Sequence, residues 1–369
     1  MKALDCCAGA GGLSLGMQRA GFDVLGIELD HDACETHRAN VGPCDQASLW
    51  DWHPAQSYDV VGGGVPCQPH SAASGASRKG TEDPRGQLYK PFLRIAQEAN
   101  SRVVFIENVR GLLSSPSATH KTAFAELCAA IKLAGWPFVK WRVLDAVDYG
   151  TPQFRRRVFV VGFRNESDCD RFAWPMPTHL PSPLLGTPWI TVRQALGLSG
   201  DYKRGLIDGA DWRSPQGARM LNVDQPATTV GATNAELLAA LDRPSPTVIT
   251  SEADAGLRVL PKTKRRKAAD TLNHALTAHA PSCAGVLDTP STTVDTTGTL
   301  SRRGRKGESN KDGAVRISVE QLAILQGFPR DFVFHGRTKE TRHRQIGNAV
   351  PPQLAEAVAK AIRTALETR

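Results

Sequence analysis

The sequence predicts an α/β protein with a large domain built on a parallel sheet that helices cover on both faces, and a smaller, irregular, mostly β domain. Two observations support this prediction. Up to about residue 163, short apolar or β-branched runs alternate with helical patterns of about ten residues or more. From Arg164 onward prolines and glycines become frequent and the helical pattern fades, until it returns near Val315. We therefore expect one discontinuous domain, residues 1–163 and 315–369, and a second domain, residues 164–314.

Each element of the large domain follows from its local pattern. Residues 2–6 form a short buried strand, a glycine-rich turn follows, and residues 13–20 form a helix. Further strands are expected where apolar or β-branched residues run together, at 22–27, 58–61, 103–106 and 158–163. Further helices are expected at 30–40, 87–99, 118–134, 317–326 and 352–366, the first of them capped by Asp30. Ligands of such a sheet gather at the carboxyl ends of its strands.

The composition excludes several classes of protein. With 41% hydrophobic and 22% charged residues the chain is globular, and no apolar run approaches the length of about 20 residues that a membrane span needs. The N-terminus lacks the apolar core of a signal peptide, so we expect a cytoplasmic protein. Its eight cysteines are scattered without a CxxC pair, which indicates reduced thiols and no metal site. The net charge of +8 favours a polyanionic partner.

A glycine-rich turn follows the first strand in the string DCCAGAGGLSLGMQRAGF. Its glycines allow backbone N–H groups to approach a ligand closely. Glu28 ends the second strand about twenty residues further on, where a carboxylate suits a ribose diol. Together these two features favour a cofactor site over a purely structural turn. Asp45, after the second helix, is either an acceptor for an adenine amine or an exposed turn residue.

Four reactive or charged residues are expected at the same edge of the sheet. Cys67 stands between prolines in GGGVPCQPHS, just after a strand, and a cysteine thiolate is a nucleophile. Glu107 ends another strand in FIENV, while Arg155 and Arg157 alternate into a strand in QFRRRV and so point the same way. A thiol, a carboxylate and two guanidinium groups in one crevice form a reactive site for a planar, hydrogen-bonding substrate.

These strings, in this order, resemble the cytosine carbon-5 DNA methyltransferases. The resemblance covers nearly all of residues 1–163 and 315–369, and the combination of PCQ, ENV, QxRxR and GNAVPP is specific. One departure is His70, where the family usually has an aromatic or small residue, whereas residues 66–68 are intact. The resemblance implies a Rossmann-like, S-adenosylmethionine-dependent methyltransferase domain, with a target-recognition domain in the middle block.

The resemblance also implies the reaction, which is transfer of the methyl group of S-adenosylmethionine to carbon 5 of a cytosine flipped out of double-stranded DNA. Cys67 would add to carbon 6, and Glu107 would contact ring nitrogen 3 and the exocyclic amine. Arg157 would hold the carbonyl oxygen, with Arg155 steadying it near Cys67. The residues implied for cofactor binding are Cys7, Gly9, Ala10, Gly12, Glu28, Leu29, Asp45, Gln46, Pro66, Leu88, Asn348 and Val350.

The middle block contains the phrase D-x-P-x-x-T-V three times and two basic runs, at 262–267 and 302–306. Each copy of the phrase is either an Asp-Pro turn that leads into a short strand or a DNA contact. The basic runs are candidate phosphate contacts. The residues that we expect to contact DNA are Gln68, Ser71, Arg85, Thr229, Thr247, Lys264, Arg265, Arg266, Thr293, Arg302 and Arg303.

Three other functions stay open: a tRNA cytosine methyltransferase of the same fold, a catalytically silent DNA-binding relative, and a Rossmann dehydrogenase. The long basic middle block favours double-stranded DNA over tRNA, by analogy with the family. The intact set of Cys67, Glu107, Arg155 and Arg157 argues against a silent relative, and the cysteine loop argues against a dehydrogenase. We further expect a monomer of bacterial or phage origin, with a cognate restriction endonuclease as partner.

Overall fold

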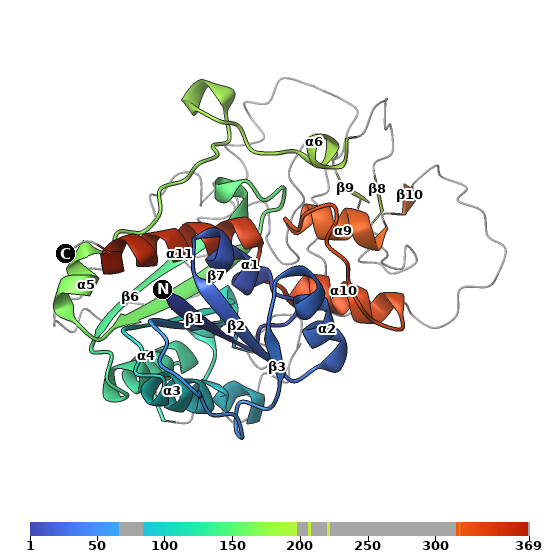
Figure 1. Cartoon of the computed structure of the whole chain (residues 1–369). Helices are drawn as coiled ribbons and strands as arrows, with labels where there is room; N and C mark the ends of the chain where they lie inside the picture. Colours follow the sequence, from blue (N-terminus) through green and yellow to red (C-terminus); the bar gives the residue numbers. More distant parts are fainter. Residues whose placement is uncertain are drawn as a thin grey trace, which may run out of the picture. The chain divides into compact units, whose positions relative to one another are not determined.

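A seven-stranded sheet forms the centre of the α/β unit (Figure 1). The computed structural model describes residues 1–65, 84–117, 119–197, 206–207, 220–221, 315–316 and 318–367. In sheet order the strands are β3 (Cys44–Gln46), β2 (Asp23–Glu28), β1 (Lys2–Cys6), β4 (Val60–Gly63), β5 (Val103–Val109), β7 (Arg156–Phe163) and β6 (Phe138–Asp145). β1 to β5 are mutually parallel, whereas β7 runs antiparallel to both β5 and β6.

The prediction of a purely parallel sheet is therefore wrong for β7 and the missed strand β6. This difference matters for the site, because an antiparallel strand begins at the edge where its parallel neighbours end. In the register of β5 and β7, Val109 lies opposite Arg157 and Glu107 lies opposite Phe159. The start of β7 and the end of β5 consequently deliver side chains to the same edge of the sheet.

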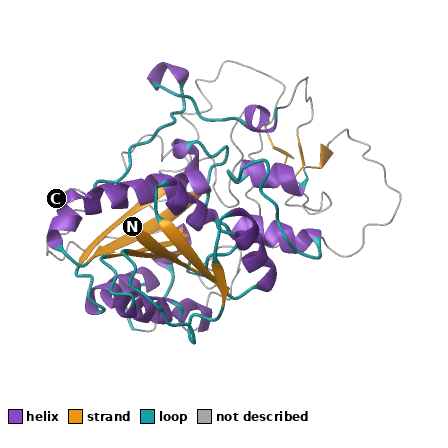
Figure 2. Ribbon diagram, viewed as in Figure 1, coloured by secondary structure: helices purple, strands orange, loops and turns teal. Residues whose placement is uncertain are grey.

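Helices cover both faces of the sheet (Figure 2). One face packs against α1 (Gly12–Arg19) and α11 (Pro352–Glu367), and the other against α3 (Tyr89–Glu98) and α4 (Ala123–Leu133), as Figure 1 also shows. Neighbouring strand residues alternate between the two cores: Val103 belongs to the first and Val104 to the second. Strands buried on both faces therefore read as continuous apolar runs, which explains why most of them could be predicted.

The helix boundaries follow from their caps. Asp30 accepts a hydrogen bond from the Ala33 amide at 3.0 Å and starts α2 (His31–Asn40), which confirms the predicted cap. α4 begins only at Ala123 because Thr122 caps it, so the predicted start at residue 118 was too early. α9 (Val319–Leu325) likewise begins after Ser318, which forms a capping box with Gln321. Missed elements besides β3 and β6 include α5 (Glu166–Arg171), α6 (Val192–Leu196) and α10 (Lys339–Asn348).

The C-terminal segment returns to the first half of the chain through a third apolar cluster. This cluster joins Ala10 of the glycine-rich turn with Leu322 of α9, Phe328, and Ile346 of α10. Val192 of α6 also belongs to it. A residue of the cofactor turn is thus packed against segments more than 180 positions away in sequence.

Part of the predicted second domain is also described. Residues 164–197 pack on the large domain, where Phe172 contacts Phe163 at a ring-centroid distance of 5.2 Å and the Tyr149 hydroxyl donates to the Pro175 carbonyl. The two-residue strands β8 (Leu206–Ile207), β9 (Met220–Leu221) and β10 (Val315–Arg316) form a small sheet in the order β10-β8-β9. The boundaries at residues 163 and 315 stay predictions.

Candidate active site

The glycine-rich turn after β1 is held by Glu28, which lies at the end of β2. The Gly9 amide donates to Glu28 Oε2 at 2.7 Å, and the Asp30 amide donates to Oε1 at 2.8 Å. Burial raises the pKa of Glu28 despite these backbone N–H groups. Cys7 and Gly9 have φ angles of 63° and 55°, and a Cβ atom at Gly9 would meet no atom within 4 Å. The turn therefore presents open backbone next to a carboxyl group that suits a ribose diol.

The C-terminal segment closes over this turn. A Cβ atom at Gly12 would lie 2.2 Å from the Val350 carbonyl oxygen, so only glycine fits there. Arg155 Nη2 donates to the carbonyls of Gly347 and Ala349 at 2.8 and 3.1 Å. Gln326 Nε2 donates to the same Ala349 carbonyl at 2.7 Å. These contacts bring buried Val350 to the turn, as predicted, and leave neighbouring Asn348 exposed.

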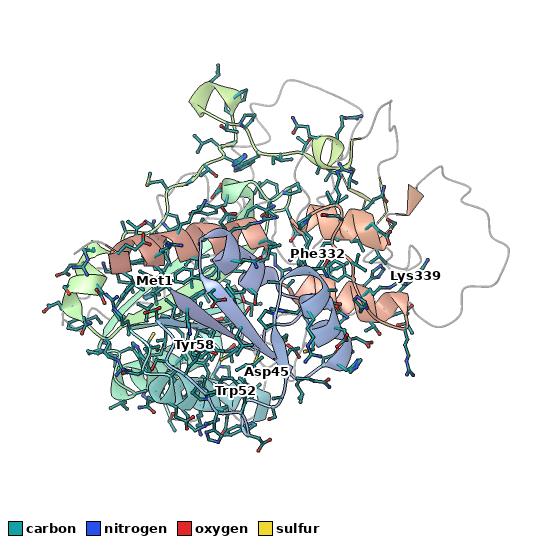
Figure 3. All side chains as sticks on the ribbon, in the orientation of Figure 1. Met1, Asp45, Trp52, Tyr58, Phe332 and Lys339 are labelled. Atoms are coloured by element: carbon teal, nitrogen blue, oxygen red, sulfur yellow. The ribbon has the colours of Figure 1, made fainter. Side chains whose placement is uncertain are left out.

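The side of the turn beyond Glu28 is open. Leu29 is 68% exposed, and Asp45 and Gln46 are exposed on β3, where Gln46 lies opposite Glu28 in the sheet. Trp52 Nε1 donates to Asp45 Oδ2 at 2.8 Å, and the two side chains lie side by side in Figure 3. This arrangement orients one carboxylate oxygen and leaves the other for a ligand.

Two other predicted cofactor residues are more enclosed. Leu88 is half-buried just before α3 and packs on the same core cluster as Cys7. Ala10 is 1% exposed and packs in the third cluster, so its side chain faces protein. Ala10 can therefore serve a ligand only through its backbone.

The edge at which β5 ends and β7 begins contains a buried ion pair. Arg157 Nε lies 2.9 Å from Glu107 Oε1, and the side chains are 11% and 9% exposed. Burial raises the pKa of Glu107, although the charges of Arg157 and Arg155 oppose this rise. A Cβ atom at Gly64 would lie 3.6 Å from Glu107 Oε2 and 3.7 Å from Val350 Cγ2. Glu107 thus borders both the cofactor side and the segment that leads to the predicted nucleophile.

Several predicted residues lie outside the described part of the chain, and their roles stay predictions. Arg85 belongs to the short 3-10 helix Pro84–Gln87. The structure describes the backbone of Arg85 but not its side chain. The others are Pro66, Cys67, Gln68, His70, Ser71, Thr229, Thr247, Lys264, Arg265, Arg266, Thr293, Arg302 and Arg303.

Sequence reasoning missed the residues that hold these groups in place. Trp52 and Gln326 carry no local pattern, since each acts on a partner that is distant in sequence. Arg155 was predicted, but its hydrogen bonds to the C-terminal carbonyls were not. The strand-end acid Asp5 was visible in the string DCCAGAGG, yet its buried partner Ser14 gave no signal.

Comparison with known proteins agrees with this geometry. The sequence model of the family described as C-5 cytosine-specific DNA methylase matches residues 1–364. The chain belongs to this family. This DNA methylase is 30% identical over 99% of its length to the Type II methyltransferase M.NgoMIV of Neisseria gonorrhoeae, covering 98% of that protein. It is 31% identical over 97% of its length to M1.HphI of Haemophilus parahaemolyticus, covering 86% of that protein.

The fold comparison leads to the same class. The structure of the methyltransferase EhMeth of Entamoeba histolytica matches with a TM-score of 0.59 at 13% identity, over 100% of this chain and 99% of that one. This likeness shows the Rossmann-like fold of S-adenosylmethionine-dependent methyltransferases, which confirms the predicted fold class. As a member of the C-5 cytosine-specific DNA methylase family, the chain methylates carbon 5 of cytosine in DNA with S-adenosylmethionine as the methyl donor, which confirms the predicted reaction and cofactor.

The turn fits S-adenosylmethionine. Its open backbone at Gly9, the carboxyl group of Glu28 and the exposed side chains of Leu29 and Asp45 provide surfaces for the methionine, ribose and adenine parts. In the described residues no group of three or more metal-binding side chains is arranged around one point. No helix of that part of the chain has the length and apolar character to cross a membrane.

Proposed function

We propose that this DNA methylase bonds Cys67 to carbon 6 of a flipped-out cytosine while Glu107, Arg157 and Arg155 hold the base. The observation that carries the proposal is the buried Glu107–Arg157 pair at the edge where Gly64 and Val350 meet. Carbon 5 of cytosine is a poor nucleophile, so a group must first add to carbon 6. Bound S-adenosylmethionine would supply the electrophilic methyl group.

Glu107 is suited to the proton that this addition requires. When the Cys67 thiolate adds to carbon 6, electrons move to ring nitrogen 3, which must gain a proton. Burial raises the Glu107 pKa, so its neutral form is available to donate that proton. When solvent takes the carbon-5 proton, the electrons of that C–H bond re-form the double bond between carbons 5 and 6 and expel the Cys67 thiolate. The proton on nitrogen 3 then returns to Glu107.

The two arginines are suited to different tasks. Arg157 pairs with Glu107 through Nε and donates through Nη1 to the Arg156 carbonyl at 2.8 Å, so Nη2 is the group that we assign to the cytosine carbonyl oxygen. Arg155 holds the carbonyls of the segment that carries Asn348 and Val350. We assign Arg157 to the base, and Arg155 to the junction between base and cofactor.

The cofactor would be held by the turn and the surfaces around it. Glu28 would accept from the ribose hydroxyls, Leu29 would pack on the adenine, and Asp45 would accept from its amine, with Trp52 orienting that carboxylate. Gln46, Pro66 and Leu88 would line the same site. Backbone groups of Cys7, Gly9, Ala10 and Gly12 would surround the methionine part.

Target recognition is assigned to residues 164–314. The basic runs would bind phosphates, and one of Thr229, Thr247 and Thr293 would contact a base. Gln68, Ser71 and Arg85 would contact the DNA near the flipped base. We further propose a monomeric enzyme of bacterial or phage origin, paired with a cognate restriction endonuclease, since its relatives carry Type II names.

The test of the proposal is Cys67→Ser, because serine cannot supply a thiolate. Transfer of a labelled methyl group to long mixed-sequence duplex DNA should fall below detection, while S-adenosylmethionine affinity stays near wild type. Cys128→Ser, a half-buried cysteine on α4, is the matched control and should retain activity. Substantial turnover by Cys67→Ser would contradict the covalent mechanism, and transfer to tRNA but not to DNA by the wild type would contradict the substrate.

A further inference from the structure

A buried chain of three polar side chains lies directly behind the cofactor turn. Ser14 Oγ is 2.6 Å from Asp5 Oδ2, and His37 Nε2 is 2.8 Å from the same Ser14 oxygen. The other ring nitrogen, His37 Nδ1, lies 3.2 Å from the Gly42 carbonyl oxygen. Asp5, Ser14 and His37 are each 0% exposed, and the catalytic scheme above uses none of them.

The imidazole ring fits there because two glycines make room for it. A Cβ atom at Gly26 of β2 would lie 2.8 Å from His37 Nε2. A Cβ atom at Gly11, within the turn itself, would lie 3.0 Å from His37 Cδ2. The ring is therefore fixed between the turn and the sheet, and its two nitrogens keep their partners.

Counting protons along the chain determines the state of Asp5. A carbonyl oxygen can only accept, so Nδ1 of His37 carries a proton and points it at Gly42. Burial lowers the pKa of His37 to about 4, so its ring is neutral and Nε2 must accept. Ser14 has one hydroxyl proton and gives it to Nε2. The 2.6 Å contact with Asp5 is then a hydrogen bond only if Asp5 is protonated and donates to Ser14.

The surroundings of Asp5 agree with a neutral carboxyl group. Burial raises its pKa to about 7, with further upward contributions from Glu28 and Glu107, while the hydroxyl and amide of Ser14 lower it. On the other side, Arg38 adds to the lowering of the His37 pKa and the Gly42 carbonyl opposes it. The thiols that face Asp5 have raised pKa values and carry no charge at neutral pH; they are Cys6, Cys7 and Cys44.

One other arrangement of the same protons keeps every hydrogen bond of the chain, and in both arrangements Asp5 Oδ1 is buried without a hydrogen-bond partner. If the Asp5 proton moves to Ser14 and the Ser14 proton moves to His37, the chain holds a carboxylate and an imidazolium. The Oδ2–H and Oγ–H bonds break, a new Oγ–H bond and an Nε2–H bond form, and no proton enters or leaves. Burial raises the pKa of Asp5 and lowers the pKa of His37, and both shifts favour the neutral arrangement.

The strand order places Asp5 between the strands that carry Glu28 and Glu107. β1, which carries Asp5, lies between β2, which carries Glu28, and β4 and β5, the latter carrying Glu107. In the proposed function the ribose binds at Glu28 and the cytosine at Glu107. A methyl donor that spans these two positions would pass over the end of β1. A cation that lies nearer to Asp5 than to His37 stabilises the carboxylate more than it disfavours the imidazolium, and so shifts the balance toward the charged arrangement.

We infer that Asp5, Ser14 and His37 form a proton relay that keeps Asp5 neutral in the free enzyme and ionises it, by passing its proton to His37, when the sulfonium binds. Asp5 thereby acts as a positioning residue, because its negative charge stabilises the positive charge of the methyl donor. The neutral thioether product, S-adenosylhomocysteine, leaves Asp5 protonated and is bound less favourably. This inference rests on the cofactor assignment of the proposed function.

The direct test observes the proton on His37. The full chain is labelled with ¹⁵N-histidine, and the ring signals of His37 are assigned by their loss in His37→Phe. Nε2 should be unprotonated in the free protein and with S-adenosylhomocysteine. It should move toward the protonated form with sinefungin, a stable analogue with an ammonium group in place of the sulfonium. A proton on Nε2 in the free protein, or the same Nε2 signal with both ligands, would overturn the relay.

Variants test the connection between proton and affinity. Ser14→Ala interrupts the relay, so the preference for sinefungin over S-adenosylhomocysteine should fall about tenfold and Nε2 should stay unprotonated with both ligands. Ser101→Ala removes another fully buried serine, before β5, and should change neither measurement. An unchanged preference in Ser14→Ala would overturn the relay. Failure of the wild type to bind either ligand would overturn the cofactor site as well.

Discussion

The two sides of the site are built from different chemical groups. The cofactor side consists of backbone N–H groups, glycines and one strand-end carboxyl group, with Gly9 and Glu28 in direct contact. The catalytic side consists of buried charges, of which Glu107 and Arg157 are paired. Backbone groups stay in place wherever the chain folds, whereas a buried charge is stable only beside its partner. The cofactor side is therefore sensitive to substitutions that add atoms, and the catalytic side to substitutions that remove a charge.

The segment 347–350 joins the two sides. Arg155 from the catalytic side holds its carbonyls, and Val350 meets Gly12 on the cofactor side. A change on either side can therefore reach the other through this segment. Substitutions that affect one side alone, or that displace segment 347–350, test this difference between the two sides.

The largest effect is expected from Glu107→Gln. The amide keeps the shape of the side chain but cannot donate an acidic proton to nitrogen 3, so kcat should fall about a thousandfold. S-adenosylmethionine affinity should remain near wild type, because other residues supply the contacts proposed for the cofactor. Single-turnover methyl transfer and calorimetric binding measure the two quantities. Turnover within about tenfold of wild type would show that Glu107 is not the proton donor.

The pH profile sharpens the same prediction. Burial raises the pKa of Glu107, so its neutral form persists to higher pH than in an ordinary glutamate. If that neutral form donates the proton, kcat of the wild type decreases as the pH rises through the raised pKa. Glu107→Gln should lack this descending limb, whereas Glu98→Gln, a change at a more exposed carboxylate on α3, should keep it. A descending limb retained in Glu107→Gln would point to another group.

A smaller effect is expected from Gly12→Ala on the cofactor side. The added Cβ atom would meet the Val350 carbonyl oxygen at 2.2 Å, and a backbone atom cannot move aside cheaply. Segment 347–350 should shift, and S-adenosylmethionine affinity should fall about tenfold, with a loss of about 1–3 kcal/mol in the free energy of unfolding.

Gly135→Ala is the control for this substitution. Gly135 has a φ angle of 111°, and a Cβ atom there would meet no atom within 4 Å. Alanine at this position should therefore lower the free energy of unfolding by about 1–2 kcal/mol through backbone strain alone. Its S-adenosylmethionine affinity should not change. If Gly12→Ala behaves like this control, the segment is not held against the turn.

The sequence predicted those elements of the fold whose pattern lies within one continuous segment. Continuous apolar strands and the Asp30 cap were found, because each depends on neighbouring residues. β6 was missed because Lys140 and Arg142 interrupt its apolar pattern and most of its residues are half-buried. α10 was missed because Ile346 is the one aliphatic side chain among its ten residues, and the other nine are polar or small.

The same limit applies to the site. The spacing of the turn and Glu28 predicted a pair that the structure brings together, since both lie on consecutive strands. The contacts of Trp52 with Asp45, Gln326 with Ala349, and His37 with Ser14 depend on how separate segments pack. Such contacts produce no periodic pattern in the sequence, because they depend on how the side chains of distant segments pack.

The most direct test of the covalent mechanism is trapping of the enzyme on fluorinated DNA. A long duplex in which 5-fluorocytosine replaces every cytosine contains the target whatever its sequence. Fluorine at carbon 5 cannot leave as a proton does, so the Cys67 adduct should persist after methyl transfer. We predict a denaturant-stable protein–DNA complex that requires S-adenosylmethionine, that Cys128→Ser still forms, and that Cys67→Ser does not form. Absence of the complex with wild-type enzyme and S-adenosylmethionine, or its formation by Cys67→Ser, would contradict the mechanism.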